Sequence, residues 1–211
     1  MAGIINFETF LFTGILLNLT PGNDTIFILS RSISYGRNAG IMSVLGIATA
    51  SLIHTTLAAF GLSIIISKSI LAFDIIKYLG AAYLIYLGIK MLIERSKFIL
   101  TQGNILKKYS LKKIYRDAVL TYVLNPKVAL FFIAFLPQFI NPGYKASVIP
   151  FLLLGITFTI TGTTWCMILA VFSSKIFSRL RSNQKLSMYL NKTCGFILIA
   201  LGLKVALTNK R

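Results

Sequence analysis

Six long apolar stretches dominate the sequence, and they restrict the chain to a helical fold embedded in a membrane. Each stretch reaches the roughly 20 residues that an α-helix needs to cross the hydrocarbon core of a bilayer. The stretches lie at residues 7–30, 39–67, 70–93, 118–140, 146–172 and 188–207. The last of them is the weakest, because Asn191 and Lys192 stand near its start.

The composition of the chain agrees with this fold class. Hydrophobic residues make up 56% of the 211 residues and charged residues only 13%, whereas about a quarter of a typical soluble domain is charged. Intrinsic disorder does not fit so apolar a chain, and two cysteines are too few for a disulfide-stapled secreted domain. We therefore predict an all-α integral membrane protein with six transmembrane helices.

Positive charge is concentrated in the links between stretches one and two, three and four, and five and six. Lys and Arg number 22 against five Asp and Glu, which gives a formal net charge of +17. The overall scarcity of charged residues argues against a nucleic-acid partner. The positive-inside rule places the three basic links in the cytoplasm and both termini outside, although the basic tail at Lys210 and Arg211 departs from it. These links also suit contact with anionic lipid headgroups.

The two halves of the chain resemble each other. Matching elements are Leu-Thr-Pro at 19–21 and Leu-Asn-Pro at 124–126, Leu-Gly-Ile at 45–47 and 154–156, Lys-x-x-Gly at 77–80 and 192–195, and Gly-x-Lys at 88–90 and 202–204. Each half holds three spans, an odd number, so the second half enters the membrane from the opposite side. We predict two inverted three-helix repeats at 1–93 and 118–211, joined by a basic cytoplasmic linker at 94–117, in one membrane domain.

A proline interrupts the first apolar stretch, and another interrupts the fourth at the matching place. Pro21, which Gly22 follows, and Pro126 each remove a backbone hydrogen bond, so we expect helices 1 and 4 to be broken there. In inverted-repeat transporters such breaks mark the substrate site near the bilayer midplane. The strongly polar residues around the two breaks are Asn18, Thr20, Asn23, Asp24, Asn125 and Lys127.

Asp24 and Lys127 are the charged members of this group. A carboxylate inside an apolar span is functional by default, as a substrate contact, a proton carrier or a counter-ion. Where the two breaks meet, Asp24 and Lys127 would either pair with each other or match the ammonium and carboxylate of an amino acid. The alternative is a fixed ion pair that only holds the repeats together. We predict that the six polar residues form a substrate-binding or proton-coupling site with no metal and no cofactor.

His54 is the single histidine, and it stands in the middle of the second stretch. Histidine changes its charge near neutral pH, which makes His54 a candidate proton carrier. The alternative is a neutral, hydrogen-bonded packing residue, which is the more common role of a lone histidine in a helix.

Several short motifs stand in order along the chain: Pro-Gly-Asn-Asp at 21–24, a small-residue turn at 36–40, Gly-Ala-x-Tyr-Leu-x-x-x-Gly at 80–88, Asn-Pro-Lys at 125–127 and Pro-Gln-Phe at 137–139. In this order and at this spacing they resemble the lysine exporter (LysE/RhtB) family of bacterial amino-acid efflux proteins over nearly the whole chain. The family's first motif commonly reads Pro-Gly-Pro-Asp. Asn23 stands in place of its second proline, which implies a less rigid break.

The resemblance implies a secondary active exporter of amino acids or their derivatives. Its partners would be the amino-acid substrate, the proton, membrane lipid and a second copy of the chain in a homodimer, in a bacterial cytoplasmic membrane. Two other functions stay open, a divalent-cation exporter of related architecture and a membrane-embedded enzyme. The first favours clustered Cys, His or carboxylate ligands, and a metalloprotease would need a motif such as His-Glu-x-x-His; neither pattern stands in the sequence.

Overall fold

Nearly every described residue lies in a helix. The computed structural model describes residues 3–19, 22–68, 70–93, 110–144, 147–173 and 184–207. In chain order it contains α1 (Phe7–Leu19), α2 (Asn23–Tyr35), α3 (Arg37–Lys68), α4 (Ile70–Ile93), α5 (Leu111–Val123), α6 (Pro126–Phe135), the 3-10 turns η1 (Leu136–Phe139) and η2 (Pro142–Tyr144), α7 (Val148–Val171) and α9 (Gln184–Leu207). Apart from an isolated bridge between Ile4 and Ile140, these residues form no strand. The predicted all-α fold is confirmed for this part of the chain.

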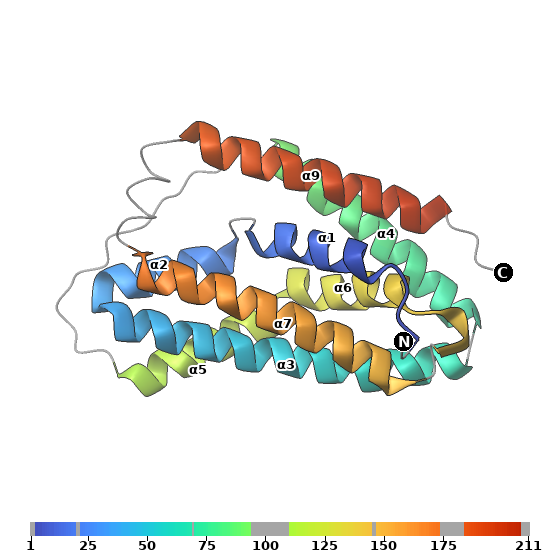
Figure 1. The fold of residues 1–211 in the computed structure, drawn as a ribbon, viewed down its shortest axis with the longest axis horizontal. Coiled ribbons are helices and arrows are strands. Elements are labelled where there is room, and N and C mark those ends of the chain that lie inside the picture. The colour runs from blue at the N-terminus through green and yellow to red at the C-terminus, as the bar shows by residue number, and fades with distance from the viewer. Residues whose placement is uncertain are drawn as a thin grey trace.

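Helices α3 and α7 lie side by side along the long axis of the molecule (Figure 1). Arg37–Leu62 within α3 and Val148–Val171 are long and apolar enough to cross a membrane. The two helices approach closely at Gly155 of α7, where a Cβ atom would collide with the side chain of Thr55 in α3. Small residues at such crossings let membrane helices pack tightly.

The first and fourth apolar stretches each contain two helices instead of one. Helix α1 ends at Leu19 and α2 begins at Asn23, whereas α5 ends at Val123 and α6 begins at Pro126. Figure 1 shows α1 and α2 running in one direction along the long axis and α5 and α6 running in the other. Both interruptions lie near the middle of this axis, which brings the polar residues around them to the same depth of the molecule.

Helix α5 begins seven residues before the expected span, within the stretch 94–117 that we assigned to the linker. Its buried residues Ile114, Ala118 and Tyr122 follow each other at intervals of four, while Lys112 and Arg116 are exposed. The helix is therefore amphipathic, and its apolar face continues past the end of the apolar stretch. Residues 94–109 of the expected linker lie outside the described part of the chain.

Helices α4 and α9 form an antiparallel pair that packs through glycine. A Cβ atom at Gly88 of α4 would lie 2.5 Å from the carbonyl oxygen of Gly195 in α9. At Gly202, further along α9, it would lie 2.8 Å from the carbonyl oxygen of Ala81. The two backbones are thus closer than any larger residue allows at these positions.

Aromatic rings pack together within the buried core, on the side of the molecule where α1 begins and α6 ends. Neighbouring rings lie between 4.6 and 6.1 Å apart, a spacing typical of favourable aromatic pairs. We call this group the aromatic cluster; it consists of Phe10, Phe131, Phe132, Phe135, Phe139 and Phe158.

Candidate functional site

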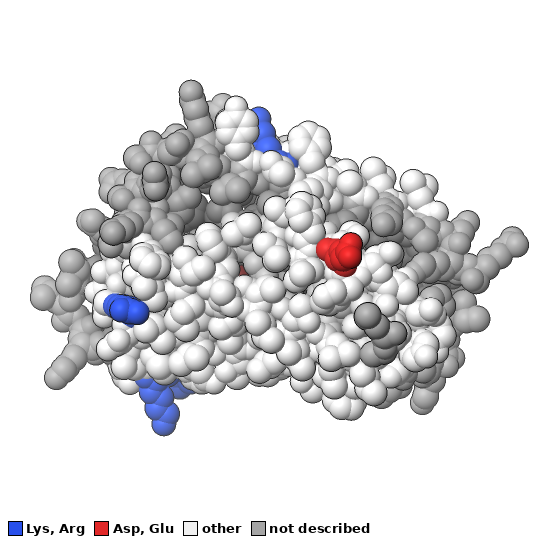
Figure 2. Space-filling view, in the orientation of Figure 1, with Lys and Arg blue, Asp and Glu red and all other residues white. Residues whose placement is uncertain are grey.

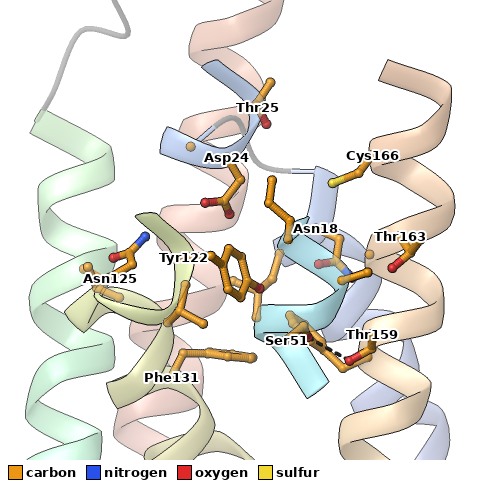
Figure 3. A pocket seen from close by; sticks show the side chains of 18 of the residues that line it. Asn18, Asp24, Thr25, Ser51, Tyr122, Asn125, Phe131, Thr159, Thr163 and Cys166 are labelled. Carbon is orange, nitrogen blue, oxygen red and sulfur yellow. Dashed lines mark hydrogen bonds between the residues drawn. The ribbon is translucent and has the colours of Figure 1, made fainter. Parts of the chain in front are cut away.

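A cavity of about 100 Å³ lies where the two interrupted stretches meet the α3–α7 pair (Figure 3). All six of the predicted spans contribute to its wall, since Leu87 and Met91 of α4 and Leu198 of α9 complete it. A water molecule occupies about 30 Å³ of the liquid, so the cavity suits a small ligand. Its polar side chains are Asn18, Asp24, Thr25, Ser51, Tyr122, Asn125, Thr159, Thr163 and Cys166.

Asp24 lies in the first turn of α2, and its carboxylate points into the cavity (Figure 3). Among the described residues of the cavity wall it is the only charged one. The start of a helix carries a partial positive charge that stabilises a carboxylate in the first turn. The Tyr122 hydroxyl and the Cys166 thiol border the same cavity.

Asn125 lies between α5 and α6, and its side chain lines the cavity. Its carbonyl accepts hydrogen bonds from the N–H groups of Val128 and Ala129, at 3.1 and 3.2 Å. It therefore occupies the position just before the first turn of α6, where asparagine is favoured. Pro126 occupies the first helical position, where the missing N–H costs nothing within the helix. This local preference explains why a new helix begins at the cavity wall.

A pair of hydroxyl groups joins α3 to α7 in the cavity wall. Thr159 donates its proton to the Gly155 carbonyl at 2.9 Å, so Ser51 is the donor in the 2.7 Å hydrogen bond between the two hydroxyls (Figure 3). The Tyr122 side chain lines the same cavity. A second link joins α1 to α7, because Asn18 donates to Thr161 at 3.2 Å. The first bond holds the central helix pair together, and the second ties the first interrupted stretch to it.

The structure brings Asn18, Gly22, Asp24 and Asn125 of the predicted site to the cavity. The structure does not describe Thr20 and Pro21, nor does it describe the side chains of Asn23, Pro126 and Lys127. The pairing of Asp24 with Lys127, or their shared contact with a substrate, therefore stays a prediction.

His54 is buried in α3 and does not belong to the described residues of the cavity wall. Its Nε2 atom lies 3.3 Å from the carbonyl oxygen of Tyr122, and its ring stacks on Phe132 at 5.7 Å. These contacts are those of a hydrogen-bonded packing residue, which was the alternative to a proton carrier. The role of proton carrier stays a prediction.

Sequence reasoning did not assign Ser51, Tyr122 or Cys166 to the site, although all three line the cavity. One signal was available in the fifth apolar stretch. Thr159, Thr163 and Cys166 follow each other at intervals of four and three, which places them on one face of a helix. A polar face on an otherwise apolar helix indicates the side that turns towards a cavity.

Comparison with known proteins agrees with the motifs. The family model for LysE type translocators matches residues 15–209. The chain is 34% identical over 200 residues to the uncharacterized membrane protein YrhP of Bacillus subtilis (strain 168), an alignment that covers 92% of this chain and 94% of that protein. It is 30% identical over 197 residues to the homoserine/homoserine lactone efflux proteins of Salmonella typhimurium and Salmonella typhi, covering 93% of this chain and 94% of each relative. No solved structure matches the chain significantly. The chain therefore belongs to the LysE type translocator family of membrane transport proteins.

Proposed function

We propose that the chain exports amino acids or amino-acid derivatives in exchange for protons, and that the cavity is the substrate site. The observation that carries this proposal is the position of Asp24, a carboxylate on the mostly apolar wall of a small cavity where an apolar stretch is interrupted. A carboxylate at such a depth interacts strongly with any cation that reaches it. The names of the Salmonella relatives make homoserine and its lactone the first compounds to test.

The chemistry of one carboxylate accounts for an exchange of substrate and proton. The Asp24 carboxylate binds either a proton or the ammonium group of a substrate, and each displaces the other. A carrier that switches between its inward-open and outward-open states only when this carboxylate is occupied would move substrate and proton in opposite directions. The start of α6, next to Asn125, carries a partial positive charge and would favour the carboxylate or carbonyl oxygen of the same substrate.

The packing of α4 against α9 supports the inverted repeat. The sequence repeat matches Gly80 with Gly195 and Gly88 with Gly202. A two-fold axis that exchanges the halves converts a contact between residues 88 and 195 into one between 202 and 80. The structure has Gly88 against Gly195 and Gly202 against Ala81, one residue from the expected partner. We propose that the two repeats move relative to each other around the cavity, as in other inverted-repeat carriers.

The charges of the described residues support an orientation. The start of α1 and the end of α9 lie at one end of the molecule, whereas the turn from α2 to α3, the start of α5 and the end of α7 lie at the other (Figure 1). Arg37 and Lys112 belong to this second end. Figure 2 shows basic side chains at the left end, the lower left and the upper edge, and an acidic side chain on the right half of the broad, mostly uncharged face. We propose that the basic end lies in the cytoplasm, so that the aromatic cluster separates the cavity from the outside.

Surface labelling tests this orientation. We expect a membrane-impermeant maleimide to label a Glu8→Cys variant in intact cells and a Lys112→Cys variant only after lysis, since the two exposed residues lie at opposite ends. The chain with its own cysteines serves as the background control. Labelling of Lys112→Cys in intact cells, with Glu8→Cys protected, would reverse the orientation.

Efflux of substrate from loaded vesicles tests the transport function. Vesicles that contain the purified chain are loaded with single amino acids, homoserine or homoserine lactone, and efflux is followed with and without an acidic outer medium. We expect an inward proton gradient to accelerate efflux of at least one compound, because protons entering at Asp24 displace the substrate. Efflux that is the same with and without the gradient for every compound would contradict proton antiport.

A further inference from the structure

The carbonyl group of Tyr122, near the end of α5, lacks its usual helical partner. In an α-helix each carbonyl accepts a hydrogen bond from the N–H four residues later. For Tyr122 that residue is Pro126, which has no N–H to donate. The Tyr122 carbonyl takes a bond from the nearer N–H of Asn125 at 3.1 Å, but a carbonyl oxygen has two lone pairs. A second donor from elsewhere in the fold can therefore bond to this buried carbonyl.

His54 supplies such a donor from α3. Its Nε2 atom lies 3.3 Å from the Tyr122 carbonyl oxygen. A carbonyl oxygen only accepts, so Nε2 carries the proton in this bond. His54 is 6% exposed and Tyr122 is 7% exposed, which leaves little water to replace the bond.

The imidazole ring also contacts the helix on the other side of the interruption. It stacks on Phe132 of α6, with ring centres 5.7 Å apart and an angle of 28° between the planes. The Tyr122 ring of α5 lies 6.0 Å away. His54 thus holds α5 by a hydrogen bond and α6 by a ring contact, on the two sides of Asn125.

We propose that His54 is a positioning residue for the substrate site, which it shapes without entering. Its donor completes the end of α5 that Pro126 leaves open, and this fixes Tyr122 and Asn125 against Ser51, less than one helical turn away on α3. All three of these residues line the cavity, whereas His54 does not. The inference rests on the proposed role of the cavity as the substrate site. It assigns the proton to Nε2 as a permanent hydrogen-bond donor, and no proton transfer passes through this ring.

Two substitutions separate positioning from proton transfer. His54→Gln keeps an N–H donor of similar reach but does not change its charge with pH, whereas His54→Leu removes the donor at similar volume. We expect His54→Leu to raise the KM for efflux by about two- to tenfold, the usual effect of losing one of two hydrogen bonds to a buried carbonyl. We expect His54→Gln to restore most of the affinity and to keep the acceleration by a proton gradient. Thr56→Val, on the exposed side of the same helix, is the matched control.

Each outcome of this experiment decides the inference. A His54→Gln protein that binds substrate but no longer responds to the gradient would make His54 a proton carrier and overturn the proposal. Efflux by His54→Leu with an unchanged KM would remove the positioning role. If the His54→Leu protein does not accumulate in the membrane, the gradient response of His54→Gln still distinguishes a positioning role from proton transfer. The unsubstituted chain is measured alongside, so that absence of any efflux from it counts against the transport function and not against His54.

Discussion

Replacing Asp24 with asparagine is expected to abolish proton-driven efflux while the protein still inserts and folds. The amide has nearly the shape of the carboxylate, but it carries no charge and binds no proton at neutral pH. A substrate ammonium would then lose its charged partner inside the membrane. Breaking a buried charge pair by removing one member costs about 3–5 kcal/mol, which corresponds to a loss in efflux rate of about a hundredfold or more.

The comparison of two transport modes makes this prediction sharper. Exchange of labelled for unlabelled substrate requires substrate binding but no net movement of protons. If Asp24 binds both substrate and proton, Asp24→Asn loses exchange together with gradient-driven efflux. If Asp24 binds only the proton, exchange survives and the substrate ammonium must bind elsewhere. Glu8→Gln, which removes one exposed acid from the start of α1, should match the unsubstituted chain in both modes. Full gradient-driven efflux by Asp24→Asn would contradict the proposed site.

The helices of this fold follow closely from the apolar stretches, because a membrane leaves few alternatives to a helix for a run of this length. The expected third span and α4 share the bounds Ile70 and Ile93. The start of α5 at Leu111 was harder to predict, since its first turns contain Lys112, Lys113 and Arg116. Only the spacing of Ile114, Ala118 and Tyr122 indicates that the buried face of the helix begins before the apolar stretch.

The site was predictable where a local motif carries it and not where tertiary contacts create it. Asp24 and Asn125 stand beside prolines in apolar stretches, which is a signal within a few residues of sequence. Ser51 carries no such signal, because hydroxyls in membrane helices usually bond to the carbonyl four residues earlier. Thr159 does make that bond, and it also meets Ser51 across 108 positions of sequence. The bond from His54 to Tyr122 joins residues 68 positions apart, so only the fold reveals it.

A single methyl group at Gly88 should damage the protein more than most changes of that size. In a Gly88→Ala variant the added Cβ would lie 2.5 Å from the backbone oxygen of Gly195. A backbone atom cannot rotate away, so α4 and α9 must move apart. Overpacking of this kind costs about 1–3 kcal/mol, equivalent to a fall in Tm of about 2–12 °C for a chain of this length. Thermal unfolding of the purified protein in detergent measures the change.

The same chain offers a matched control and a test of the repeat. A Cβ added at Gly61 of α3 meets nothing within 4 Å, so Gly61→Ala should equal or slightly exceed the parent in Tm, given the higher helix propensity of alanine. By the proposed two-fold relation, Gly202→Ala should be destabilising like Gly88→Ala, since its Cβ would lie 2.8 Å from the Ala81 oxygen. Leu87 and Leu198, which adjoin this packing, also line the cavity. Separation of α4 and α9 should therefore lower efflux as well as stability. A Gly88→Ala protein with unchanged Tm and unchanged efflux would show that the two helices are not held this closely in the membrane.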